Sequence, residues 1–181
     1  MRKRWLCWLW IGMLGTALLG GQGGEEAAAR ISLAAAVVIP GQEFSLPLYL
    51  STSDPAVTKT SQITFDMALS SPGLTFVKLE STFLGEQVQA ELSVQVEESK
   101  THVKIMVPAD SEQFLPVGPV SFLRFKVSDH STGQDVKVML KNIEIRDTAG
   151  RLVRSPQESE GEVTVVAPDM VPLFSCFFYL H

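Results

Sequence analysis

The 181 residues of this chain provide for one domain, alone or with tails, and 45% of them are hydrophobic and 19% charged. These proportions are ordinary for a globular protein with its own hydrophobic core. Acidic residues outnumber Lys and Arg by 20 to 15. This balance excludes the strongly basic surface that nucleic acids and anionic membranes require of a partner.

Residues 1–24 have the three-part layout of a secretory signal peptide. Basic residues at 2–4 precede an apolar run at 5–19, and small residues follow. A run of about 15 residues is short for an uncleaved membrane anchor, which needs about 20. We therefore expect export to the cell envelope or the extracellular space, with cleavage near residue 24 or, alternatively, after the alanines that end at residue 29.

Removal of this leader changes the charge and the cysteine count. The mature chain would hold 12 basic and 20 acidic residues, a formal net charge of −8. Cys176 would be its only cysteine, so no internal disulfide is expected. The next residues, 25–30, are small and polar and predict a linker.

Alternating apolar and polar side chains predict β-strands throughout 31–166. The stretch 31–50 predicts two strands joined by a turn at Pro40-Gly41, and Pro47 in the second strand indicates an edge or a bulge because proline donates no ladder hydrogen bond. The chain therefore predicts an all-β fold, an antiparallel β-sandwich of jelly-roll type with about nine strands. The remaining strands are expected at 62–67, 74–79, 92–96, 103–107, 120–127, 136–145 and 163–165.

Local features refine this pattern. The segments 92–96 and 103–107 predict a hairpin, because a short charged connection separates them. The alternation changes phase within 120–127 and again near Asn142, and one extra residue in a strand is what a β-bulge supplies. Residues 81–87 are expected to form a loop or a single helical turn.

The end of the chain, 167–181, is apolar but too short to span a bilayer. A sorting tail, a late strand and a disordered end all fit its composition, and the residues do not select among them.

Five segments in order resemble the cohesin family, whose modules bind dockerins in cellulosomes and related assemblies. Together they cover about three quarters of the chain. The resemblance identifies 31–166 as a cohesin-like β-sandwich. The segments are VIPGQEF at 38–44 with LPL at 46–48, ITFDM at 63–67 followed by LTFV at 74–77, VKIMVPADS at 103–111, GPVSFLRFKV at 118–127 and GEVTV at 161–165.

The resemblance implies a secreted, non-catalytic binding module with a protein partner, either a dockerin or another exported protein, in a context such as extracellular polysaccharide degradation. It also implies binding through one sheet face and the loop before Gly118. The polar candidates have a simpler alternative interpretation as the solvated face of an antiparallel sheet. Carried onto this sequence, the partner-binding candidates are Gln62, Thr64, His102, Lys104, Leu115, Val117 and Gly118.

An enzyme is not expected, because general acid–base chemistry requires a positioned pair of groups. His102 has no acid or nucleophile at a recognised spacing, and His130 lies in a turn sequence. We assign no catalytic, cofactor-binding or metal-binding residue. The alternative function is a carbohydrate-binding module of the same fold, which needs exposed flat aromatic rings. Tyr49 is the only outward-facing tyrosine expected in the domain.

Overall fold

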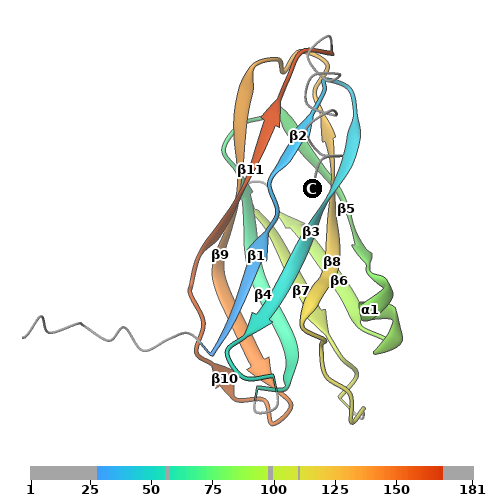
Figure 1. Ribbon diagram of the computed structural model, residues 1–181, viewed down its shortest axis with the longest axis vertical. Coiled ribbons are helices and arrows are strands. Elements are labelled where there is room, and N and C mark those ends of the chain that lie inside the picture. Colours follow the sequence, from blue (N-terminus) through green and yellow to red (C-terminus); the bar gives the residue numbers. More distant parts are fainter. Residues whose placement is uncertain (1–27, 56–57, 98–99, 110, 169–181) are drawn as a thin grey trace, which may run out of the picture.

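The computed structural model describes residues 28–55, 58–97, 100–109 and 111–168 (Figure 1). The expected leader, 1–24, lies outside the described residues. So do the first half of the expected linker, 25–27, and all of the tail beyond Pro168.

The described residues form two β-sheets that face each other, with a single short helix (Figure 1). The four-stranded sheet has the order β1-β3-β8-β5. The larger sheet has the order β2-β11-β9-β4-β7-β6, and β10 pairs with β9 beside this path. The predicted all-β sandwich is therefore confirmed. The elements are β1 (Ala29–Leu33), β2 (Ala36–Val38), β3 (Glu43–Thr52), β4 (Thr60–Leu69), β5 (Leu74–Ser81), α1 (Phe83–Gln87), β6 (Glu91–Glu97), β7 (Lys100–Met106), β8 (Gly118–Val127), β9 (Gln134–Asp147), β10 (Leu152–Val153) and β11 (Ser159–Val165).

The described residues form eleven strands where about nine were expected, because the first expected strand is split between the sheets and the short β10 pairs with β9. Ile31 pairs with Leu50 in the four-stranded sheet, whereas Val38 pairs with Val165 of β11 in the larger one. The β2–β11 pair is parallel, whereas the other strand pairs among the described residues are antiparallel. The chain therefore crosses from the four-stranded sheet to the larger sheet between β1 and β2.

The core lies between the sheets and is built from the inward side of each alternating strand. Phe125 is fully buried, and its ring stacks on Phe44 at 5.7 Å between centroids and meets Phe76 edge-on at 5.8 Å. Ring pairs at these separations stabilise a core beyond the burial of their area. Gly161 lets the backbone of β11 approach the side chain of Leu33 closely, since a Cβ at position 161 would lie 2.7 Å from Cβ of Leu33.

Both predicted bulges are present. The register of β3 against β8 shifts beside Leu48, where Val120 is the extra residue. The register of β4 against β9 shifts between Thr64 and Asp66, and Asn142 has a φ of 52° there. Pro47 lies one residue beyond the end of the β1–β3 ladder, so β3 has only one partner strand at that point.

Candidate functional site

The outer face of the larger sheet carries a band of polar side chains across β6, β7, β4 and β9. In each strand these residues alternate with the buried ones, as period two requires. The central strands β4 and β7 place Thr64 opposite Lys104 and Asp66 opposite His102. We call this surface the β4/β7 face. Its three rungs are Glu91–Met106–Gln62–Arg146, Ser93–Lys104–Thr64–Glu144 and Gln95–His102–Asp66–Lys141.

A hydrogen-bond network fixes one rung of the β4/β7 face. Nδ1 of His102 lies 2.9 Å from Oδ1 of Asp66, and the side-chain amide of Asn142 donates to Oδ2 at 2.8 Å. The hydrogen bond with His102, followed by that from Asn142, lowers the pKa of Asp66 below its ordinary value of 3.8. Asp66 is therefore an anion at neutral pH, held between a β7 side chain and the β9 bulge.

The lysines of the β4/β7 face, unlike His102, form no ion pair with its acidic side chains. Among the described residues, Lys104 has no ion pair within 4 Å, and neither has Lys141 on the rung beside it. Glu144 pairs with Arg146 on its own strand, with 3.1 Å between Nη2 and Oε2. The ammonium groups of these two lysines therefore remain available to an acidic or carbonyl-rich partner.

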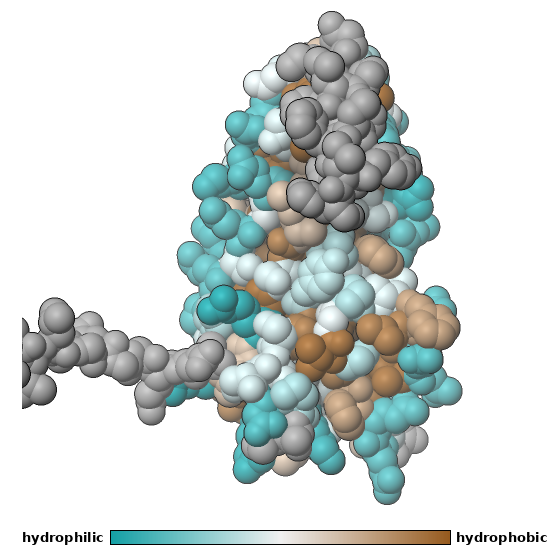
Figure 2. Space-filling view, viewed as in Figure 1, coloured by the Kyte–Doolittle hydropathy of each residue, from teal (hydrophilic) through white to brown (hydrophobic). Residues whose placement is uncertain are grey.

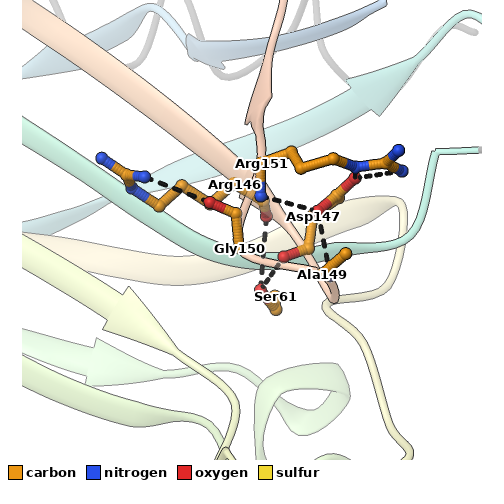
Figure 3. Close-up of polar contacts among 6 residues, drawn as sticks. All are labelled: Ser61, Arg146, Asp147, Ala149, Gly150 and Arg151. Atoms are coloured by element: carbon orange, nitrogen blue, oxygen red, sulfur yellow. Dashed lines mark hydrogen bonds and ion pairs between the residues drawn. The ribbon is translucent and has the colours of Figure 1, made fainter.

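A hollow of about 200 Å³ bounds the β4/β7 face at the Gln62 end. Its walls are Gln62 and Met106 on the face, the segment after β7, and the turn that follows β9. The turn is ordered by Asp147, whose Oδ1 accepts the backbone N–H groups of Ala149 and Arg151 at 2.9 Å each (Figure 3).

Further contacts fix this turn against β4. The side chain of Arg151 binds Oδ2 of Asp147, and the hydroxyl of Ser61 donates to the Asp147 carbonyl oxygen at 2.6 Å (Figure 3). Arg146 donates from Nη1 to the Gly150 carbonyl oxygen at 3.1 Å. The Arg151 backbone donor, followed by its guanidinium, lowers the pKa of Asp147. The hollow therefore has one rigid wall.

The seven predicted residues fall into two groups. Gln62, Thr64, His102 and Lys104 lie together on the β4/β7 face. Leu115 is only 2% exposed and belongs to the core, so its side chain contacts no partner; its N–H donates to the Thr60 carbonyl oxygen at 2.7 Å. Leu115 is thus removed from the set of candidate contacts.

The remaining two predicted residues do not lie on this face. Gly118 pairs with Leu50 in the four-stranded sheet, and its position faces Leu84 of α1. Val117, which precedes Gly118, is 47% exposed. Any binding role of these residues stays a prediction, and it belongs to the other layer of the sandwich.

The predicted set omitted several residues of the β4/β7 face. Asp66 could have been included, because its outward phase on the strand is visible in the sequence. Lys141, Glu144 and Arg146 lie on β9, which is far from β4 in the sequence but pairs with it. The signal for these three was the change of phase at Asn142.

The outer face of the four-stranded sheet differs from the β4/β7 face. Hydrophobic side chains gather there beside α1 and the start of β8 (Figure 2). Phe83 is 72% exposed and Tyr49 is 40% exposed, while Phe122 and Pro47 are half-buried neighbours on adjacent strands. We call these residues, with Leu84 and Pro119, the α1 patch.

The described part of the chain has neither a cluster of metal-binding side chains nor a membrane-spanning helix. No group of three or more His, Cys, Asp or Glu residues there could hold a metal ion. The same residues include no helix of the length and hydrophobicity that crossing a membrane would require.

Comparison of the sequence with protein-family models and with curated proteins finds no match. Solved structures do match. The non-cellulosomal cohesin of the archaeon Archaeoglobus fulgidus superposes with a TM-score of 0.63 at 20% identity, over 82% of this chain and 98% of that one. The chain has the cohesin fold.

Other cohesin structures agree with this assignment. The sixth cohesin of Acetivibrio cellulolyticus scaffoldin B, solved with a dockerin, gives a TM-score of 0.65 at 13% identity, over 77% of this chain and 99% of that one. A type I cohesin from Clostridium thermocellum, also in complex with a dockerin, gives 0.64 at 14% identity over the same shares. The cohesin fold thus accounts for the described domain from β1 to β11.

Proposed function

We propose that this chain is an exported, non-catalytic binding module that holds a protein partner on its β4/β7 face. The partner would be a dockerin or another exported protein, and the setting would be the cell envelope or the extracellular space. A role in extracellular polysaccharide degradation belongs to the same proposal.

One observation carries the proposal. The cohesin-fold sandwich presents four adjacent strands whose outward side chains are mostly polar, and the Lys104 ammonium at their centre has no ion pair among the described residues. A hydrogen-bonded sheet is a rigid docking surface, because its backbone needs little ordering when a partner binds. Similar structures that were solved with dockerins support a protein as the partner.

The test is a direct binding measurement with matched charge reversals. The immobilised domain is offered a panel of purified dockerins and the exported proteins of its source, and the affinity of any binder is measured. We expect Lys104→Glu to weaken binding at least tenfold, because it reverses the charge at the centre of the face.

Lys126→Glu is the control. Lys126 is an exposed strand lysine on the opposite sheet, also without an ion pair among the described residues, so its reversal changes the net charge equally. Equal losses in both variants would indicate a non-specific charge effect and contradict the proposal. Absence of any protein binder would contradict it as well.

A second candidate function is carbohydrate binding, and the α1 patch favours it. Phe83 and Tyr49 are both substantially exposed on this surface, and flat rings of this kind stack on the apolar faces of sugars. Retention of the chain on insoluble polysaccharide, lost in Tyr49→Ala and Phe83→Ala but kept in Lys104→Glu, would support this candidate. Absence of retention would exclude it.

A further inference from the structure

The side of the sandwich between β5 and β6 is open. A cleft of about 460 Å³ lies there, between the edge strand of the four-stranded sheet and the edge strand of the larger one. Val96 in this cleft is 72% exposed, although it has the inward phase of its strand. The apolar side chains that line the cleft are Met67, Leu69, Leu74, Phe76 and Val96.

Uncovered edges such as these are sites where another strand can add, and folded proteins usually cover or block them. A second copy of this chain fits the edge poorly. Antiparallel pairing of β6 with the same strand of another copy, centred on Val94, would place Glu91 opposite Glu97 at both ends. Like charges directly opposite each other destabilise a strand pair. In this register the charges of β6 therefore disfavour pairing with a second copy.

Residues 169–181 have the composition that the cleft would accommodate. Nine of these 13 residues are hydrophobic, in the sequence DMVPLFSCFFYLH. Left in water, that segment would expose apolar side chains, which is unfavourable. It is an apolar stretch that directly follows the sandwich, and burial in the cleft would remove part of its apolar area from water.

The last described strand ends at the same end of the sandwich as the cleft. The Val165 carbonyl oxygen accepts the N–H of Gly133 at 2.8 Å. The turn before Gly133 is tied to the cleft wall, because Ser128 donates its N–H to the Gly73 carbonyl oxygen at 2.9 Å and Leu74 lines the cleft. Thirteen extended residues reach up to about 43 Å. This reach exceeds the distance from the end of β11 to the cleft, which amounts to a few strand spacings of about 4.8 Å each.

We propose that the apolar side chains of residues 170–180 occupy the cleft between β5 and β6 and cover both strand edges. The occupant follows from composition, from the position of Val165 and from the charges that disfavour a second copy. The inference is independent of the function proposed for the β4/β7 face, which lies on the outer surface of the larger sheet.

The test uses Cys176, which lies within this segment, as a built-in probe in the full chain carrying Cys7→Ser. A second cysteine is introduced singly at the cleft rim, as Val96→Cys, Thr75→Cys or Thr101→Cys. Matched controls are Tyr49→Cys on the α1 patch and Ser93→Cys on the β4/β7 face. Because a disulfide requires Cα atoms within about 7 Å, its yield under mild oxidation reports proximity.

We expect at least one rim variant to form an intramolecular disulfide in tenfold higher yield than either control. Equal yields at all positions, or the highest yield at Tyr49→Cys or Ser93→Cys, would overturn the proposal. Covalent dimers whose yield rises with protein concentration would also overturn it, because they would indicate a second copy at the edge.

A second measurement needs no introduced cysteine. Phe174→Asp with Phe177→Asp makes the segment unsuited to an apolar cleft, and Ser175→Asp is the control for added charge. We expect the double variant to bind a dye specific for exposed apolar surface several-fold more strongly than the wild type and the control. Unchanged dye binding would contradict the proposal.

Discussion

Asn142 is the position at which the fold and the candidate site depend on each other most clearly. Its backbone has a φ of 52° at the β9 bulge, and its side chain donates to Asp66 on the β4/β7 face. We consider two substitutions, Asn142→Ala and Asn142→Gly. Both remove the side-chain hydrogen bond, but only alanine also introduces a Cβ that disfavours the left-handed conformation.

The magnitudes predict an inverted order of stability. Loss of the exposed hydrogen bond costs about 0.5–1.5 kcal/mol in either variant. The left-handed conformation costs an ordinary L-residue about 1–2 kcal/mol, whereas glycine in a regular strand is about 0.5–1 kcal/mol worse than alanine. Asn142→Gly should therefore be more stable than Asn142→Ala by about 0.5–1 kcal/mol in urea unfolding.

The neighbouring Lys141 provides the control. It is exposed and does not have a positive φ, so Lys141→Gly should be less stable than Lys141→Ala by about 0.5–1 kcal/mol. If alanine is the more stable substitution at both positions, the left-handed bulge at Asn142 is not a feature of the folded protein. The reasoning that links the bulge to the Asp66 network would then be refuted.

Three further predictions concern the core and the pH dependence. Leu115→Ala should cost about 2–5 kcal/mol in chemical unfolding and Val117→Ala less than about 1, because only the first is buried; equal costs would contradict the placement of Leu115 in the core. Gly161→Ala should cost about 1–3 kcal/mol, since its new Cβ would lie 2.7 Å from Cβ of Leu33; a neutral effect would show that these strands are not in close contact. The contacts that lower the pKa of Asp66 stabilise the fold at pH values above the ordinary pKa of 3.8. This stabilisation is lost as the pH falls through the lower pKa that Asp66 has in the folded protein. The stability gap between the wild type and Asp66→Asn should thus be constant above about pH 5 and shrink in more acidic solution, whereas a gap that widens there would have the wrong sign.

The sequence was sufficient for the parts of the fold that depend on local alternation. The hairpin of β6 and β7 and the bulges near Val120 and Asn142 follow from the spacing of apolar residues, and the turn at Gly41 follows from the Pro-Gly pair. The division of the first strand between the two sheets was not predictable. Alternation is the same in either sheet, so it does not indicate which partner a strand takes.

The same limit applies to the candidate site. Gln62 and Thr64 were assigned to an outward face correctly, because outward phase is a local property. The proximity of Lys141 and Glu144 to them depends on the pairing of β4 with β9, although these two residues follow Gln62 and Thr64 by more than 75 positions in the sequence. Leu115 was misplaced because it belongs to a loop, where periodicity gives no information about burial.

The most direct test of the account is to map a bound protein partner on the domain by backbone amide chemical shifts. The account predicts that the shifts change at Gln62, Thr64, His102 and Lys104 and remain unchanged at Tyr49 and Phe122. Changes confined to Tyr49, Phe122 and their neighbours on the four-stranded sheet would contradict the claim that the β4/β7 face is the binding surface.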